Sequence, residues 1–505
     1  MQQYQKQKGY TMVLFIAFII AVLLAGFSLY DNGTVASERI RMQNTADATA
    51  YSTMNVLSRD MNFIAYTNRA MVANQVAMAQ MVGLSSWIHM LDRMIQNIDD
   101  VATWAQLFPP VGVPLKRVTK IIATITDKGK RAFDKFAGFT IKALDAYGLV
   151  ISKSQHGFQI ITVDMAVATY NEVSKANDAD IKQGFVTGTY AAMTLAKTWK
   201  KELDRNKYAS TRRGRDQKRW LARYREFAGV VRDSRDPFSS KRSRPWMNWI
   251  GAGLAGFSLK ASIQKIGGTD FREVKQGRGR NLQWEWTAMD TVSFWLRVKT
   301  WWSTKTFEAI PMGGGAAHAL NGGRRGNKDN FAYRSQSRNQ ATFFNQGSRL
   351  DEKKKWRRWG NGAWQNGMTA SQAAYVDRGN NLERTKGLRA FWDLKKNEKK
   401  DTGPQMISML TKDTDKVRLQ QTLDEESTDY NRSATFNIEQ QGSIANETLY
   451  GLSKAETYFS RPKDLWPRPD GYREYGNLYN PFWQTRLIDT NIKERLAAIA
   501  AAHLM

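Results

Sequence analysis

The chain has 505 residues, 42% of them hydrophobic, and its 75 Lys and Arg against 47 Asp and Glu give a formal charge of +28. This length allows two or three domains with a buried core, and 17 Trp, 18 Tyr and 23 Phe exclude a chain that is disordered throughout. The absence of cysteine excludes disulfides, cysteine-ligated zinc or iron–sulfur sites and thiol catalysis.

The excess positive charge lies entirely beyond residue 100, because the first hundred residues hold equal numbers of basic and acidic side chains. Such a basic region favours an anionic neighbour: nucleic acid, anionic lipid head groups, acidic polysaccharide or an acidic protein. Charge alone does not choose among these partners.

A membrane helix is predicted for residues 11–30, which carry no charge and are long enough to span the hydrocarbon core of a bilayer. The apolar run is longer than that of a cleaved secretory signal, so we expect the segment to stay attached. Lys6 and Lys8 precede it, whereas acidic residues temper the basic ones behind it. The N-terminus (residues 1–10) is therefore predicted to be cytoplasmic, with the remainder beyond a bacterial inner membrane.

Residues 31–108 are predicted to form a helical stalk, because apolar residues recur three and four positions apart and no proline precedes Pro109. One face of this helix needs a partner. Two alternatives are open: the face packs on the protein's own domain, or it forms an assembly seam with similar helices of other chains. The seam residues are Met54, Leu57, Met61, Ile64 and Met71.

Three stretches near the N-terminus stand out: Lys8-Gly9-Tyr10, Asp31-Asn32 and the run Arg39-Ile40-Arg41-Met42-Gln43-Asn44-Thr45-Ala46-Asp47-Ala48-Thr49-Ala50. Together with the apolar helix, they resemble the start of TadE/TadG-like Tad pilus assembly proteins. Two C-terminal stretches are also similar to longer members of this group, namely Ala455 to Pro462 and Leu478 to Leu487. The resemblance implies a minor-pilin-like protein with a single membrane anchor, pilus or pilus-platform partners, and homo- or hetero-assembly through N-terminal helices.

Two features depart from related patterns. If Gly9 and Tyr10 formed a leader-processing junction, the fifth mature residue would be Leu14, where type IV prepilins carry Glu; both a processed and an unprocessed N-terminus stay open. TadG-like proteins often contain a metal site with the motif Asp-x-Ser-x-Ser, and the nearest fragment here, Asp290-Thr291-Val292-Ser293, has different spacing. No metal site is predicted.

An α+β fold is predicted for the rest of the chain. Prolines at positions 109, 110 and 114 are expected to stop the first helix, and residues 109–236 to hold further helices. Residues 237–320 are predicted to contain a small antiparallel sheet, because apolar residues alternate on both sides of a Gly-Arg turn at 277–280, and again at 294–298. Trp301 and Trp302 adjoin these strands and are expected to pack in the core, the alternative being a membrane interface.

The C-terminal half is expected to be less regular. Residues 321–403 are predicted to form long basic loops, and 404–505 an α+β region with a tail rich in proline and aromatic residues. Within it, Ile407 to Leu423 has helical spacing, Thr448 to Phe459 leads into a strand-like segment, and Asn491 to Met505 is predicted to be a closing helix.

A basic and aromatic tract offers a candidate contact for an anionic polymer, since single-stranded nucleic acids are held by cations beside aromatic planes. The tract could equally be an exposed loop whose tryptophans dock on the domain, or a contact for lipid head groups or polysaccharide. Its residues are Lys353, Lys354, Lys355, Trp356, Arg357, Arg358 and Trp359.

No catalytic or cofactor-binding residues are predicted. Glu285, Asp290 and Glu308 are close only in sequence and are expected to be solvated or salt-bridged, while the glycines 313–315 lack the Lys-Ser/Thr of a phosphate loop. The leading hypothesis is therefore a non-enzymatic, membrane-anchored structural component of a pilus or related secretion apparatus. The alternatives are DNA capture or surface adhesion, and, more remotely, an envelope polysaccharide-processing enzyme with paired carboxylates.

Overall fold

The fold was analysed in a computed structural model, which describes residues 10–106, 109–181, 185–206, 215–240, 242, 244–276, 281–321, 381–395, 400–413, 448–462, 465 and 467–503. The chain divides into two compact units. Unit 1 comprises Met1–Tyr66, His156–Asp204 and Trp392–Met505, and unit 2 comprises Thr67–Gln155 and Arg205–Phe391. Each unit is a mixture of helix and antiparallel sheet, which confirms the predicted mixed fold class. The predicted basic loops of residues 321–403 fall mostly outside the described residues.

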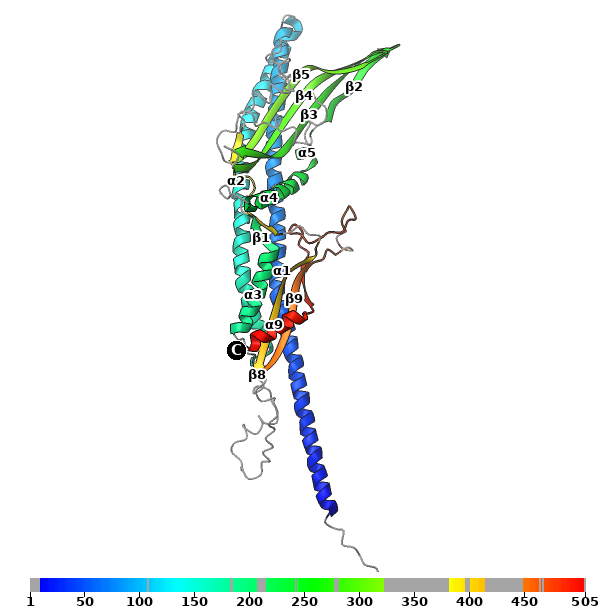
Figure 1. The fold of residues 1–505 in the computed structure, drawn as a ribbon. Coiled ribbons are helices and arrows are strands. Elements are labelled where there is room, and N and C mark those ends of the chain that lie inside the picture. The colour runs from blue at the N-terminus through cyan, green and yellow to red at the C-terminus, as the bar shows by residue number, and fades with distance from the viewer. Residues whose placement is uncertain are drawn as a thin grey trace, which may run out of the picture. The chain divides into compact units, whose positions relative to one another are not determined.

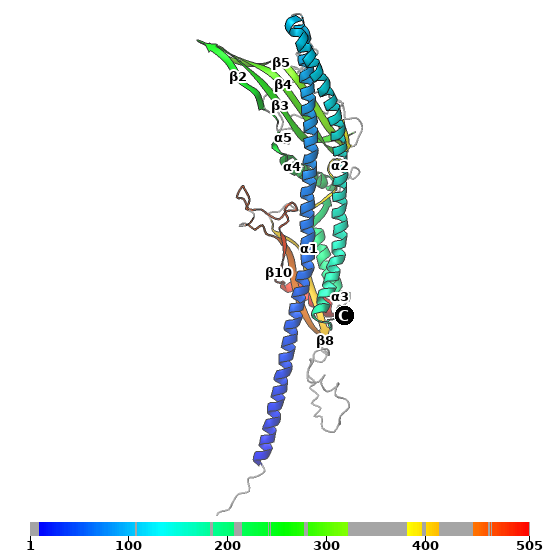
Figure 2. The same ribbon diagram turned by 180° about the vertical axis from the view of Figure 1, so that it is seen from behind.

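Two long helices contribute to both units (Figures 1 and 2). Helix α1 runs from Tyr10 to Ala105 and α2 from Pro109 to Asn177. Helix α1 ends just before the predicted proline stop, and α2 begins on Pro109, a position where the missing N–H of proline costs no helical hydrogen bond.

Unit 1 contains a three-stranded antiparallel sheet in the order β10-β9-β8. Its strands are β8 (Thr402–Asp413), β9 (Thr448–Phe459) and β10 (Trp483–Ile488), and its shorter helices are α3 (Phe185–Glu202) and α9 (Ile492–His503). The core joins the first part of α1 to α2, α3 and this sheet. One cluster of this core consists of Met42, Ala46, Ala50, Met54, Leu57, Ala166, Tyr170, Ile181, Ala191, Met406, Leu410 and Ala455.

The helix predicted from Ile407 is wrong for the residues that the structure describes, because 407–413 belong to strand β8. Residues 403 and 404 and 406–412 of this strand are all buried, so both faces carry buried apolar residues, with Met406 and Leu410 on one face and Ile407 and Met409 on the other. A strand that is buried on both faces lacks the alternation that distinguishes it from a helix. The other two predictions hold: β9 covers the strand-like segment before Ser460, and α9 is the closing helix.

Unit 2 contains a five-stranded sheet in the order β2-β3-β4-β5-β6, in which β2 to β5 are antiparallel and β6 is parallel to β5. The strands are β2 (Arg244–Leu254), β3 (Phe257–Gln276), β4 (Asn281–Lys299), β5 (Thr304–Asn321) and β6 (Asn381–Thr385). Helices α4 (Arg215–Asp233) and α5 (Pro237–Ser240) complete it. Two short strands, β1 (Leu203–Asn206) and β7 (Phe391–Leu394), form a separate pair.

The predicted hairpin around residues 277–280 is confirmed by the β3–β4 pairing, in which Phe271 lies opposite Trp286 and Val274 opposite Gln283. The predicted aromatic packing is also present, since the Phe271 ring centroid lies 4.5 Å from that of Trp286. The alternation at 294–298 belongs to the same strand, β4, and not to a further one as expected, because β4 continues to Lys299.

Strand β5 lies close against the part of α1 that belongs to unit 2. A Cβ atom at Gly315 would lie 2.4 Å from the backbone nitrogen of Met90, and one at Gly313 would lie 2.9 Å from the carbonyl oxygen of Met90. The hydroxyl of Ser86 donates to the Gly315 carbonyl at 3.2 Å. The glycines that superficially suggested a phosphate loop therefore allow a strand backbone to contact a helix backbone.

Candidate functional site: the N-terminal helix and its docking surface

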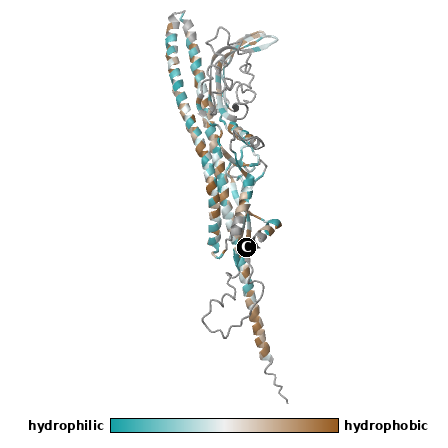
Figure 3. Cartoon of the chain, turned by 60° about the vertical axis from the view of Figure 1, so that its left-hand side comes forward, coloured by the Kyte–Doolittle hydropathy of each residue, from teal (hydrophilic) through white to brown (hydrophobic). Residues whose placement is uncertain are grey.

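The first turns of α1 are apolar and exposed. Leu14, Phe18 and Leu29 expose 68%, 65% and 74% of their surface, and no part of the most hydrophobic stretch is buried by the protein. Its mean hydropathy reaches 2.9, and Figure 3 shows this end of α1 in brown. By length and composition α1 is the one helix of the described residues that could cross a membrane. An unburied apolar segment of this length requires a non-aqueous neighbour.

Beyond the exposed segment, α1 docks on unit 1 through small residues. Ala46 and Ala50 are fully buried, and strand β9 approaches the helix so closely that a Cβ atom at Gly451 would lie 2.5 Å from the carbonyl oxygen of Met42. The side-chain amide of Gln43 donates to the carbonyl of Leu452 at 2.9 Å. The docking depends on the absence of side chains at the crossing point.

Four charged residues fix α1 to unit 1 near the start of its docked part. The Lys412 ammonium lies 2.9 Å from a carboxylate oxygen of Asp178 and 3.1 Å from one of Glu38. Arg41 donates to the carbonyl of Asn177 at 3.1 Å. Burial lowers the pKa of Lys412, but the hydrogen bonds to Asp178 and Glu38 outweigh it and raise the pKa above its usual value. These residues form the charged collar: Glu38, Arg41, Asp178 and Lys412.

Asp60 is a buried carboxyl group on the docked part of α1, fully hidden from solvent. Neither oxygen accepts a hydrogen bond from the described residues, and the hydroxyl of Thr162 on α2 donates instead to the carbonyl of Phe158 at 2.9 Å. Burial raises the pKa of Asp60 to about 7, and the proximity of Thr162 opposes the shift only in part. Asp60 is therefore a group that gains or loses its charge near neutral pH.

The predicted seam residues are all buried within this chain. Met54, Leu57, Met61 and Ile64 lie in the core of unit 1, and Met71 is buried in unit 2. Their burial agrees with the first of the two alternatives, in which the helix packs on the protein's own domain. An assembly contact through the same side chains stays a prediction.

The other predicted site residues give less information. Tyr10 is the first residue of α1, and Gly9 lies outside the described residues. The basic and aromatic tract from Lys353 to Trp359 also lies outside them. Among the described residues no group of three or more His, Asp or Glu side chains is arranged to hold a metal ion.

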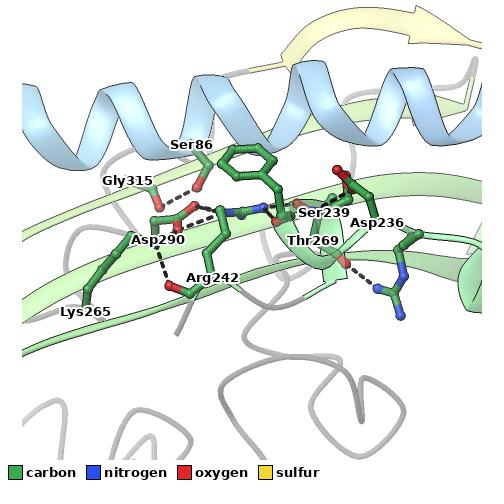
Figure 4. Close-up of polar contacts among 10 residues, drawn as sticks. Ser86, Asp236, Ser239, Arg242, Lys265, Thr269, Asp290 and Gly315 are labelled. Carbon is green, nitrogen blue, oxygen red and sulfur yellow. Dashed lines mark hydrogen bonds and ion pairs between the residues drawn. The ribbon is translucent and has the colours of Figure 1, made fainter. Parts of the chain in front are cut away.

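A second polar site lies inside unit 2, on the face of the sheet that packs against α1 (Figure 4). The Asp290 carboxylate accepts hydrogen bonds from Arg242 at 2.7 Å and from Lys265 at 2.6 Å, and it is completely buried. Arg242 also donates to the hydroxyl of Thr269 at 2.7 Å. Burial alone would raise the pKa of Asp290, but the two cations hold it below its usual range. Asp290 is thus salt-bridged, one of the two states predicted for it.

Gly267 makes this ion cluster fit. It pairs with Asp290 across β3 and β4, and a Cβ atom at Gly267 would lie 2.0 Å from a carboxylate oxygen of Asp290. Burial lowers the pKa of Lys265, and the attraction of Asp290 counteracts it. All members are enclosed and satisfied by one another, so the cluster is a structural feature rather than a binding site.

The end of the sheet in unit 2 carries exposed aromatic side chains, which corrects the prediction that Trp301 and Trp302 pack in the core. They expose 75% and 90% of their surface because they lie in the turn between β4 and β5, past the paired residues. The β2–β3 turn lies at the same end, since Ser258 pairs with Lys299. We call this surface the aromatic tip. It consists of Leu254, Phe257, Trp301 and Trp302.

Sequence reasoning missed the charged collar, the cluster at Asp290 and the buried state of Asp60. Only Asp60 had a local signal, since it lies between Leu57 and Met61 on the predicted apolar face. The collar brings together residues from positions 38 to 412, and no local pattern encodes such a contact.

Comparison with known proteins supports the N-terminal resemblance. Residues 9–55 match the family model described as putative Flp pilus-assembly TadE/G-like. The match covers the exposed apolar segment of α1, the part that carries Glu38 and Arg41, and the first part of the docking surface. No curated protein and no solved structure matches the chain. The resemblance of the C-terminal segments stays a prediction.

Proposed function

We propose that the protein is a single-pass, membrane-anchored structural component of a Tad or related type IV-like pilus assembly apparatus. The observation that carries the proposal is the position of the TadE/G-like match: it falls on an exposed apolar helix that continues without a break into a folded unit. The family match supports a pilus-assembly role, and the apolar segment supports anchoring in a membrane.

In the proposed arrangement residues 11–30 span the inner membrane, residues 1–10 are cytoplasmic, and the rest of unit 1 and all of unit 2 lie outside the cytoplasm. Lys6 and Lys8 before the apolar segment support this orientation, because cytoplasmic flanks of membrane helices are enriched in Lys and Arg. The docking surface and the charged collar would hold unit 1 at a fixed position on the anchor. The mechanism is structural, and we propose no enzymatic activity.

Cysteine labelling tests the orientation directly, because the chain contains no cysteine of its own. In intact cells of a strain with a permeable outer membrane, we expect Trp302→Cys to react with a membrane-impermeant maleimide. We expect Gln3→Cys to react only after lysis. The reverse pattern, or equal labelling of both variants before lysis, would contradict the proposed topology.

Partner identification tests the pilus role. The tagged full chain is purified from native membranes, and mass spectrometry is applied to its N-terminus and to the proteins recovered with it. Pilins or pilus-platform proteins are expected with the natural chain. They should be lost when residues 11–37 are exchanged for an unrelated membrane helix that still anchors the domain, because this exchange leaves the buried residues from Met42 onward in place. Recovery of these partners by both proteins would overturn the assignment of the role to this segment.

Surface adhesion or DNA capture is a second candidate function, favoured by one observation. The aromatic tip exposes four large apolar side chains, and Lys260 and Lys299 are exposed beside it. Aromatic planes next to cations can hold anionic polymers. The soluble domain would then bind single-stranded DNA or an acidic polysaccharide in a salt-sensitive manner, and Trp301→Ser with Trp302→Ser would weaken the binding. Unchanged binding in this double variant would exclude the tip.

A further inference from the structure

Helix α2 carries a second apolar face that the protein leaves exposed. In unit 2 its inward side is buried, with Ala137 and Ile141 fully hidden and Asn74 donating to the carbonyl of Leu144 at 2.8 Å. The outward side is also apolar, although ordinary surface helices carry polar residues there. Phe139 exposes 73% of its surface and Ile125 64%.

The exposed residues follow a strict repeat of four and three positions, which is the spacing of a coiled-coil seam. The run covers ten consecutive core positions, all of them apolar or glycine, over about 48 Å of helix at roughly 1.5 Å per residue. We call it the outer seam. Its members are Val118, Ile122, Ile125, Gly129, Ala132, Phe136, Phe139, Ala143, Ala146 and Val150, and all are exposed.

Groups of large residues alternate with groups of small residues along the outer seam. Phe136 and Phe139 project as knobs, whereas Gly129 and Ala132 leave hollows, and a Cβ atom at Gly129 would meet no atom within 4 Å. Hollows between large side chains suit the side chains of a facing helix. A membrane surface has no side chains to fill these hollows, so the pattern of large and small residues favours a helical partner.

The charged residues beside the outer seam indicate what kind of helix would bind to it. Lys128, Lys135 and Lys142 are exposed and lie seven residues apart in the row beside the seam. In the part of the chain that the structure describes, none of them has an ion-pair partner. The row on the other side is uncharged, with Thr126, Phe133 and other neutral residues. A second copy of this seam offers no acidic residues to the lysines, and two copies in antiparallel order would place lysines against lysines.

We propose that the outer seam of α2 binds an amphipathic helix of another protein, whose apolar seam has the same spacing and is flanked by acidic residues. The apolar residues supply the affinity, and the lysine row selects the acidic partner and its register. The inference is independent of the pilus role, because it concerns residues 118–150 and not the segment that the family model matches.

The test uses the purified full chain in lipid nanodiscs and two synthetic helices of four heptads. Both peptides carry Leu at the seam positions, and their flanking positions carry Glu in one and Lys in the other. Three ion pairs at about 0.5 kcal/mol each correspond to a preference of about tenfold for the Glu peptide at low salt. Phe136→Asp with Phe139→Asp should abolish binding of both peptides, with the helical circular dichroism retained because both residues are exposed.

Charge reversal gives the sharper result. The triple variant Lys128→Glu, Lys135→Glu and Lys142→Glu should prefer the Lys peptide by about tenfold. Lys120→Glu is the matched control, since Lys120 is exposed on the same helix but lies on the side away from the seam, and it should not change the preference.

Several results would overturn the proposal. One is equal binding of the two peptides, or binding of neither. Another is self-association of the purified chain that Phe139→Asp abolishes, which would assign the seam to a second copy. A third is slow maleimide labelling of Phe139→Cys in the monomer, which would show that the chain itself covers the seam. Flotation with anionic vesicles that is lost in the double Phe variant would assign the seam to a lipid surface.

Discussion

The side chain of Asn62 forms two hydrogen bonds with the backbone of Trp483, in place of those that a further neighbouring strand would form. Its amide nitrogen donates to the Trp483 carbonyl at 2.9 Å, and its oxygen accepts from the Trp483 backbone nitrogen at 2.9 Å. Trp483 begins β10, one of the two edge strands of the sheet in unit 1. A residue of α1 thus completes the pairing at the start of an edge strand, and this anchors the C-terminal sheet to the N-terminal helix.

Replacing this amide should destabilise unit 1. Asn62→Leu leaves two backbone groups of a buried residue without partners, at about 1–3 kcal/mol each when no water replaces the lost bond. Urea unfolding followed by circular dichroism measures the loss. Gln484→Ala, which removes only an exposed contact with Tyr458, should change the free energy of unfolding by less than about 0.5 kcal/mol. Equal effects of the two substitutions would contradict the assigned role.

Asp60 should make the stability of unit 1 depend on pH. Its pKa in the folded protein is about 7, above the ordinary value of 3.8, so the folded state binds the proton more tightly than the unfolded state. The stability is therefore highest below about pH 4 with respect to this group and falls as pH rises to about 7. A shift of about three pH units corresponds to a loss of at most about 4 kcal/mol.

Asp60→Asn mimics the protonated carboxyl and isolates this contribution. Urea midpoints of the natural chain and the variant, measured from pH 4 to 8, should diverge as pH rises, with the variant more stable at pH 8. Two parallel curves would show that Asp60 does not titrate in this range.

The ion cluster of unit 2 should be intolerant of removing its anion. Asp290→Asn leaves Arg242 and Lys265 buried without a counter-charge, and breaking such a buried pair costs about 3–5 kcal/mol. The same change at Asp470, an exposed carboxylate paired with Arg468, serves as the control and should cause a much smaller loss, because solvent screens an exposed ion pair. Thermal unfolding of both variants provides the comparison, and a similarly small loss at Asp290 would refute the structural role of the cluster.

A pair of glycine substitutions tests the contact between β5 and α1. Gly315→Ala places a Cβ atom 2.4 Å from the Met90 backbone nitrogen and should destabilise unit 2 by more than about 1 kcal/mol, because neither backbone can easily move. Gly229→Ala lies in α4 with no atom within 4 Å and should stabilise the unit by about 0.5–1 kcal/mol. We expect the changes in the free energy of unfolding, measured by urea unfolding, to have opposite signs for the two variants. Two losses of the same size would argue against the close contact.

The parts of the fold that could be predicted are those that leave a local pattern. Residues 11–30 stand out by composition alone, and the β3–β4 hairpin by alternation on both sides of a glycine turn. Strand β8 was misread because residues on both of its faces are buried, which removes the alternation. Trp301 and Trp302 were misread because the sequence does not show that they fall in a turn.

The contacts of the candidate site could not be predicted for a different reason. Lys412 meets Glu38 from 374 positions away, and Asn62 meets Trp483 from 421 positions away. Such pairs depend on the tertiary fold, and a single sequence gives no information on which distant residues meet. The family resemblance at residues 9–55 was accessible because it lies in one continuous segment.

The fit of Asp290 against Gly267 also bears on how unit 2 reaches its native state. Strands β3 and β4 pair along almost their whole length, and so long a hairpin can close in several alignments that differ by two residues. Only the native alignment brings the carboxylate opposite the residue without a side chain and between two cations. In the two alignments shifted by two residues, Asp290 would lie opposite Lys265 or Thr269, whose side chains occupy the space that Gly267 leaves open, and such a hairpin should reopen more easily. The ion cluster thus disfavours folding intermediates in which the two strands are misaligned. Loss of the cluster should slow folding and promote aggregation, even under conditions where the native state remains favoured.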